Sequence, residues 1–127
     1  NEKLFNEVFT DFQDNIILLP KDENLHHTIV SSDICASAYS TTLIEAMCFE
    51  KPTLQMIMAQ VEELPDYSKN EGCIAIETIN ELANILKQED FLIEIKRQNE
   101  YVNKYFNHLG TSSKEILEYI QGKKSAN

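Results

Sequence analysis

The alternation of apolar and polar positions along the chain predicts an α/β fold. Short apolar runs bounded by polar turns occur at about residues 15–19, 33–37, 53–58 and 73–76, and runs of this length are typical of buried strands. Apolar residues at helical spacing lie between and after them. We therefore expect a Rossmann-like parallel sheet of about four strands flanked by helices, with a helical C-terminal end.

Helical periodicity places several helices around that sheet. Residues 2–12 form the first, and Leu25, Ile29 and Val30 mark a short second one. Further helices are predicted to begin near residues 40, 78, 90 and 112. Gly110 stands where a left-handed C-cap would end the longest of them.

These elements fit one domain over residues 1–127. Its Rossmann-like core is expected to span residues 1–76, and its C-terminal helices residues 77–122. In the last helix we expect the apolar side chains to face inward. They are Ile116, Leu117 and Ile120.

The predicted helix near residue 40 carries an unusual carboxylate. Residues 43–49 are apolar except for Glu45, which predicts a buried helix in which a carboxylate needs a partner. Thr42 and Glu45 have the spacing of a capping box. The same spacing recurs at residues 78–81 and 112–115, so a purely structural role for Glu45 stays open.

The residues just before this helix favour a second interpretation. Ser40, Thr41 and Thr42 place three hydroxyls at a helix start that follows a short apolar strand. Free amides and hydroxyls there suit a phosphate, and parallel sheets bind ligands beyond the carboxyl ends of their strands. A glutamate one turn further suits the vicinal hydroxyls of a ribose. Glu45 would then be buried because it faces a sugar.

Composition narrows the classes of partner. The formal net charge is −10 without a run of basic residues, so nucleic acid is not expected as a partner. The chain shows neither a membrane-span pattern nor a signal-peptide pattern. Cys35, Cys48 and Cys73 lie in apolar surroundings, which indicates buried thiols of a reducing, cytoplasmic compartment rather than a disulfide or zinc framework. A first residue Asn1 inside an amphipathic stretch suggests a part of a longer protein.

Other chemistry finds little support. His26 and His27 are adjacent and would point in different directions on a helix, which disfavours a shared metal. Ser40 lacks the glycines of a nucleophile elbow, and the chain has no glycine-rich phosphate loop. No metal site is expected, and the catalytic residues stay unassigned.

The segment from Ser32 to Pro52, S-D-I-C-A-S-A-Y-S-T-T-L-I-E-A-M-C-F-E-K-P, resembles the donor-binding half of GT-B-fold glycosyltransferases. The similarity consists of an aspartate before a strand, hydroxyls in the turn, a glutamate-alanine pair on the helix, and lysine-proline before the next strand. Within that superfamily, the segment resembles bacterial enzymes of surface-polysaccharide and lipopolysaccharide synthesis. Ala38 and Tyr39 stand where that family often has glycines.

This resemblance implies half of a GT-B fold that binds a nucleotide sugar as substrate, with no cofactor. Ser40, Thr41 and Thr42 would contact the donor diphosphate, and Glu45 the ribose hydroxyls. The acceptor site and the catalytic base would belong to a missing N-terminal domain, so the chain alone would be inactive. Surface-polysaccharide synthesis also implies a parent enzyme at the cytoplasmic face of the inner membrane.

Two alternatives stay open. A nucleotide-sugar 2-epimerase shares the fold, the turn and the glutamate, and its other catalytic groups would lie mostly outside these residues. A non-catalytic α/β interaction module would keep the fold without the chemistry. Nucleotide binding by the isolated chain separates an enzyme half from an interaction module.

Overall fold

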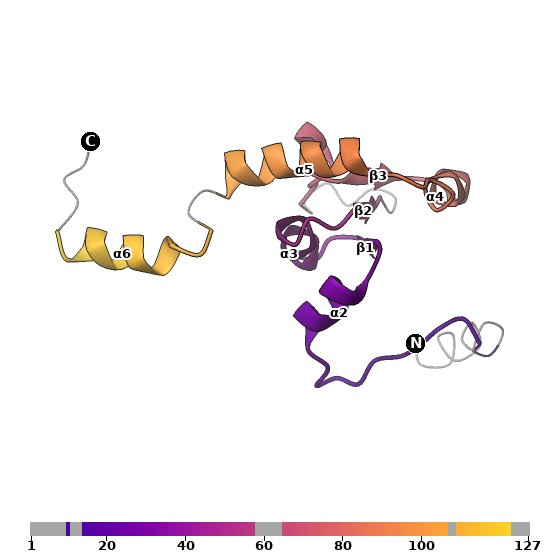
Figure 1. Ribbon diagram of the computed structural model, residues 1–127, viewed down its shortest axis with the longest axis horizontal. Helices are drawn as coiled ribbons and strands as arrows, with labels where there is room; N and C mark the ends of the chain where they lie inside the picture. The colour runs from indigo at the N-terminus through magenta and orange to yellow at the C-terminus, as the bar shows by residue number, and fades with distance from the viewer. Residues whose placement is uncertain (1–9, 11–13, 58–64, 107–108, 123–127) are drawn as a thin grey trace.

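The computed structural model describes residue 10 and residues 14–57, 65–106 and 109–122 (Figure 1). Within these residues the chain forms a small parallel sheet surrounded by helices, an α/β arrangement consistent with a Rossmann-like fold. The elements in order are α2 (Leu25–Ser31), β1 (Cys35–Ser37), α3 (Thr42–Cys48), β2 (Thr53–Met56), the 3₁₀ turn η1 (Lys69–Glu71), β3 (Ile74–Ile76), α4 (Ile79–Ile85), α5 (Leu92–Tyr105) and α6 (Ser112–Ile120).

The sheet has the order β1-β2-β3, and both neighbouring pairs are parallel. Cys35 pairs with Thr53, and Leu54 pairs with Ile74. The central strand is the most buried, since Thr53, Leu54 and Gln55 have almost no exposed surface. This confirms a parallel sheet built from the last three predicted strands.

The fourth predicted strand, at residues 15–19, was wrong. Residues 16–20 have no regular secondary structure, and the side chain of Ile17 is 84% exposed. An apolar run ended by a proline satisfies the local pattern of a strand, but a strand also needs a neighbour to pair with. The helix predicted over residues 2–12 lies outside the described residues, apart from Thr10.

Helix α3 connects the sheet to the rest of the core. It contacts β1, β2 and α5, and it buries Leu43, Ala46 and Met47. Cys48 and the C-cap residue Phe49 are exposed. The expectation of a helix buried all round was therefore wrong, because one face of α3 meets the core and another meets solvent.

A small apolar cluster joins the sheet to α3 and α5. Met47, Cys73 and Val102 form its buried centre. The half-buried side chains packed around it are Ile44, Tyr67, Tyr101 and Phe106. Met47 belongs to α3, Val102 to α5, and Cys73 directly precedes β3, so this cluster fixes how α3 and α5 lie against the start of β3.

A buried glutamine also attaches α5 to the sheet. The amide nitrogen of Gln98 donates to the Lys51 carbonyl at 2.8 Å, and its oxygen accepts from the Thr53 amide at 2.9 Å. Buried backbone groups need such partners. Gln98 therefore stabilises the segment where the chain enters β2.

Of the helix starts with capping-box spacing, only the one before α4 forms a capping box. Thr78 accepts from the Glu81 amide at 3.2 Å while the Glu81 carboxylate accepts from the Thr78 amide at 3.0 Å, a complete box before α4. At α6 the N-cap is Thr111, whose hydroxyl donates to Glu115. The box predicted at Ser112 is not formed, because that residue already belongs to the helix.

Helix α6 lies apart from the sheet, beyond the far end of α5 (Figure 1). Its apolar side chains are 53% to 75% exposed, so the prediction that Ile116, Leu117 and Ile120 face inward was wrong. Gly110 does adopt a left-handed φ of +77°, but α5 already ends at Tyr105. In the part of the chain that the structure describes, no helix is long and apolar enough to cross a membrane.

Candidate functional site

The predicted site residues lie between the carboxyl end of β1 and the first turn of α3. Ser40 precedes the helix, Thr41 is its N-cap, and Thr42 and Glu45 belong to its first turn. Ser40 and Thr42 are half-buried, whereas Thr41 is exposed. The structure therefore brings all four residues to one end of one helix, as the sequence predicts for a loop at the carboxyl end of a parallel strand.

The hydroxyls of this turn bond to each other. Ser40 Oγ donates to Thr42 Oγ1 at 2.8 Å and accepts from the Thr42 amide at 3.1 Å. The amides of Leu43 and Ile44 donate to the carbonyls of Ser40 and Thr41. The amides of residues 42–44 are thus already used. The expectation of free helix amides for a phosphate was wrong, and side-chain hydroxyls are the groups that this turn offers.

Glu45 has a different partner from the one its spacing predicts. It does not close a capping box with Thr42, because Thr41 is the N-cap and the side chain of Thr41 makes no capping hydrogen bond. Instead Oε2 of Glu45 lies 3.0 Å from Nε2 of His26 on α2. The side chain of Glu45 is 39% exposed. Glu45 is therefore neither buried nor a cap, and its carboxylate faces solvent beside a histidine.

His26 makes a second contact with α3. Its ring centroid lies 5.7 Å from that of Phe49, with the two planes inclined by 54°. Glu45 and Phe49 are four residues apart, which places them on one face of a helix. The sequence gives no sign of this contact of His26, because a bond across 19 positions has no local signal.

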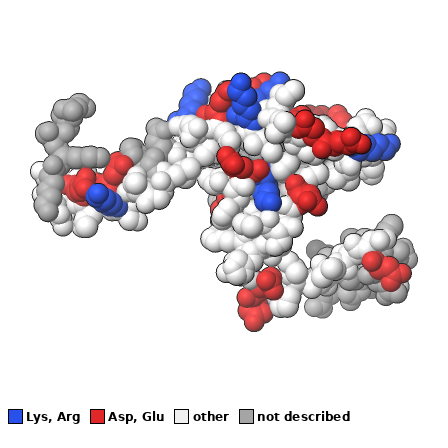
Figure 2. Space-filling view, in the orientation of Figure 1, with Lys and Arg blue, Asp and Glu red and all other residues white. Residues whose placement is uncertain are grey.

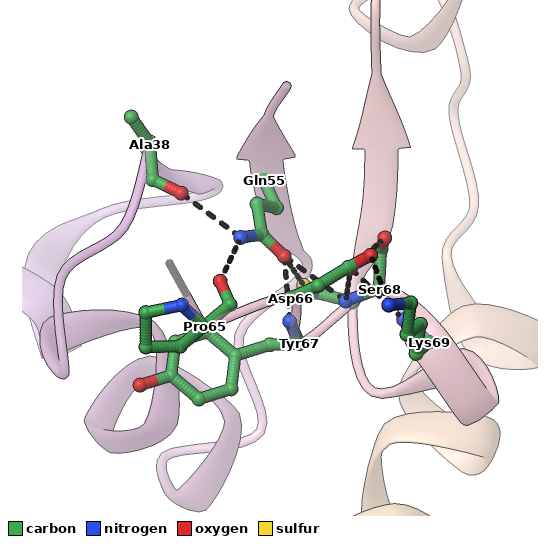
Figure 3. A network of polar contacts seen from close by, with 8 residues as sticks. Ala38, Gln55, Pro65, Asp66, Tyr67, Ser68 and Lys69 are labelled. Carbon is green, nitrogen blue, oxygen red and sulfur yellow. Dashed lines mark hydrogen bonds and ion pairs between the residues drawn. The ribbon is translucent and has the colours of Figure 1, made fainter. Parts of the chain in front are cut away.

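Gln55 on β2 joins the β1–α3 loop to the segment before β3 (Figure 3). Its Nε2 donates to the carbonyls of Ala38 and Pro65 at 3.0 and 2.8 Å. Its Oε1 accepts from the amides of Tyr67 and Ser68 at 2.8 and 3.0 Å. One fully buried side chain thus holds the backbone next to the predicted site. Sequence reasoning missed it, because a polar residue in a short strand gives no sign of such partners.

The next turn along the chain is organised by Asp66. Oδ1 of Asp66 accepts from the hydroxyl and the amide of Ser68 at 2.5 and 3.0 Å, and from the Lys69 amide at 3.2 Å. The Ser68 hydroxyl bond, followed by the backbone bonds, lowers the pKa of the Asp66 carboxyl. The segment after Pro65 is therefore a turn closed by an aspartate side chain. Residues 58–64, which lie between β2 and this turn, are outside the described residues.

The cysteines differ in environment. Cys73 is buried, and burial raises the pKa of its thiol to about 12. Cys35 is half-buried, whereas Cys48 is exposed, so the expectation of three buried thiols was wrong for Cys48. Among the described residues, no group of three or more His, Cys, Asp or Glu side chains could hold a metal ion.

A separate hollow of about 260 Å³ lies between η1, β3 and α5. Arg97 and Glu71 on its wall have their Nε and Oε2 atoms 3.7 Å apart. Its lining consists of Ser68, Glu71, Cys73, Ile74, Ala75, Glu94, Arg97 and Gln98. None of the predicted site residues is among them, so this hollow is separate from the predicted site at the start of α3.

The described surface is predominantly acidic. On the face seen in Figure 2, acidic side chains are distributed over most of the molecule, and basic side chains gather mainly over α5. This pattern agrees with the net charge of −10. Any anionic ligand near α3 therefore needs local donors, because the overall field of the protein repels it.

In comparisons with known proteins, no protein-family model, no curated protein and no solved structure matches the chain. The class of protein is therefore defined here by its fold, an α/β domain with a three-stranded parallel sheet. Its function has to be argued from the residues at the end of β1.

Proposed function

We propose that this chain is the donor-binding domain of a GT-B-type glycosyltransferase of surface-polysaccharide or lipopolysaccharide synthesis. The parent enzyme would transfer a sugar from a nucleotide donor to a glycan or lipid-linked acceptor. The observation that carries the proposal is the half-exposed carboxylate of Glu45, which belongs to the first turn of the helix that follows β1, the same helix whose start carries the hydroxyls of Ser40 and Thr42. Parallel sheets bind their ligands at this end.

The diphosphate and the ribose of the donor each have a partner in this arrangement. Ser40, Thr41 and Thr42 would contact the diphosphate through their side-chain hydroxyls, since the amides of the turn are used internally. Glu45 would accept from the ribose hydroxyls. An ionised carboxylate has about four acceptor positions, and His26 occupies one of them. Enough acceptors remain for two vicinal hydroxyls.

In this proposal the parent enzyme catalyses a displacement at the anomeric carbon of the donor sugar. The bond between the anomeric carbon and the leaving phosphate oxygen breaks, and a bond to the acceptor oxygen forms. The acceptor proton passes to a base in the missing N-terminal acceptor domain. In this proposal the present chain binds and orients the donor, works in the cytoplasm at the inner membrane face, and does not transfer sugar alone.

Calorimetric titration with UDP, CMP, CDP and GDP tests the proposal. We expect one nucleotide to bind, and Glu45→Ala to weaken that binding at least about tenfold by removing the ribose contact, which corresponds to about 1.4 kcal/mol. The variant should stay folded, because an exposed contact such as that between Glu45 and His26 contributes at most about 1 kcal/mol to stability. Unchanged nucleotide affinity in Glu45→Ala would contradict the assigned role.

Glu81→Ala is the matched control. Glu81 is also a glutamate in the first turn of a short helix, but its carboxylate caps the backbone. We expect this variant to be less stable and to bind the nucleotide as tightly as the wild type does. If both variants lose affinity together, the loss reports unfolding rather than a ribose contact.

A second candidate function is favoured by α6. Its apolar side chains are exposed on a helix that lies apart from the sheet, and amphipathic helices commonly bind apolar surfaces of partners. A non-catalytic interaction module would use this helix and would need no nucleotide. Absence of binding to all four nucleotides, with the wild type folded, would favour this second function.

A further inference from the structure

We propose that His26 is the positioning residue for Glu45 and thereby gives the site its preference for ribose over deoxyribose. This inference rests on the proposed function, because it concerns the same nucleotide site. It adds a residue from α2 to a site that sequence reasoning confined to the β1–α3 turn and the first turn of α3. The observation behind it is the 3.0 Å contact between Nε2 of His26 and Oε2 of Glu45.

The direction of this hydrogen bond follows from the chemistry of the pair. An ionised carboxylate only accepts, so the Nε2 atom of His26 must carry the hydrogen. His26 therefore acts as a donor that holds Oε2 in one place. Within the described part of the chain no group bonds to Oε1 of Glu45, so that oxygen offers both of its acceptor positions to a ligand.

The ring of His26 is itself held from the same helix. Phe49 lies against it at 5.7 Å between centroids, four residues after Glu45. Both contacts connect α2 to one face of α3. The side chain of His26 is nevertheless 61% exposed, so this pair lies at the surface, where a ligand can reach the carboxylate.

Positioning matters because Glu45 is a half-exposed side chain with several rotatable bonds. A glutamate side chain loses considerable rotamer entropy when a ligand fixes it. Fixing one such side chain on binding changes affinity by a factor between about 2 and about 10. His26 removes part of this cost before the nucleotide arrives, and only contacts made by the Glu45 carboxylate gain from it.

The test compares ribonucleotides with their 2′-deoxy forms. UDP, CMP, CDP and GDP are each titrated against the corresponding deoxynucleotide, with wild type, Glu45→Ala and His26→Ala. We expect the wild type to prefer the ribose form, Glu45→Ala to lose this preference, and His26→Ala to reduce it by a factor between about 2 and about 10. A general loss of fold would weaken both forms equally.

Two further variants separate positioning from packing. His26→Gln keeps an N–H donor that reaches toward Glu45, and it should restore most of the ribose preference. His27→Ala alters the neighbouring histidine of α2 and should leave the preference unchanged. Circular dichroism establishes that each variant is folded.

The outcomes distinguish this inference from the proposed function. A ribose preference that Glu45→Ala abolishes and His26→Ala leaves intact would overturn the role of His26 alone. Nucleotide binding by none of the chains, or a ribose preference that survives Glu45→Ala, would overturn the proposed nucleotide contact and this inference with it.

Discussion

Single residues decide how the loops around the predicted site are held, and Gln55 is the main one. Its side chain is fully buried. The amide nitrogen donates to backbone carbonyls of two segments, and the amide oxygen accepts from backbone amides of the second segment. A buried polar side chain is stable only when its donors and acceptors have partners. Among the described residues, no buried side-chain polar atom lacks a hydrogen-bond partner.

Replacing Gln55 with leucine should therefore destabilise the protein strongly. Leucine has a similar size, but it leaves the Ala38 and Pro65 carbonyls and the Tyr67 and Ser68 amides without their shared partner. Pro65 is exposed and the Ser68 amide keeps its bond to Asp66, but the half-buried Ala38 carbonyl and Tyr67 amide lose their partner. Each such group costs about 1 to 3 kcal/mol, so we expect a loss of at least about 2 kcal/mol. Urea denaturation followed by circular dichroism measures it.

Gln121→Leu serves as the control for this substitution, since Gln121 is exposed at the end of α6. It should change the free energy of unfolding by no more than about 0.5 kcal/mol. A Gln55→Leu variant as stable as this control would mean that the loops hold their positions without the amide.

The residue scale also shows what the sequence could not supply. Hydroxyls at residues 40–42 and the carboxylate at residue 45 were predicted as neighbours, because short sequence separation on a helix start brings them together. Gln55, Gln98 and the partner of Glu45 were not predicted, because their bonds cross 10 to 47 positions. Such contacts depend on tertiary packing, which local patterns do not encode.

At the scale of elements, the capping box before α4 gives a clear prediction. Thr78→Ala removes the hydroxyl that accepts from the Glu81 amide, and it should lower the free energy of unfolding by about 1 kcal/mol. Thr78→Ser keeps the hydroxyl and should retain most of that stability. Thermal and urea unfolding of the two variants give the comparison; equal losses in both would contradict capping as the cause.

Elements were predicted well where local patterns define them. Helices α2 to α6 and strands β1 to β3 each overlap a predicted element within a few residues. The sequence failed where an element needs a partner, as at residues 15–19, which have the composition of a strand but no regular structure. Three helix starts likewise have the spacing of a capping box, but only the one before α4 forms it. The surrounding backbone decides which residue becomes the N-cap.

At the scale of the whole molecule, α6 is a separate projection. It has no buried residue and lies beyond α5, away from the sheet (Figure 1). The core instead joins the sheet, α3 and α5. We therefore expect the core to fold whether or not α6 is present.

A chain ending at residue 106 tests this independence. Because α6 buries nothing, its removal should change the free energy of unfolding by no more than about 1 kcal/mol. Affinity for the nucleotide should stay the same. Urea denaturation and calorimetry measure the two effects, and a large loss of stability would mean that α6 packs on the core in solution.

The Gln55 amide has a mechanical consequence for the whole domain. One rigid planar group carries hydrogen bonds to the loop after β1 and to residues 65–68. If either segment moves away, it must break its hydrogen bonds to the Gln55 amide, and that same amide also bonds to the other segment. We therefore expect the loop after β1 and residues 65–68 to open together, in one cooperative step, rather than separately.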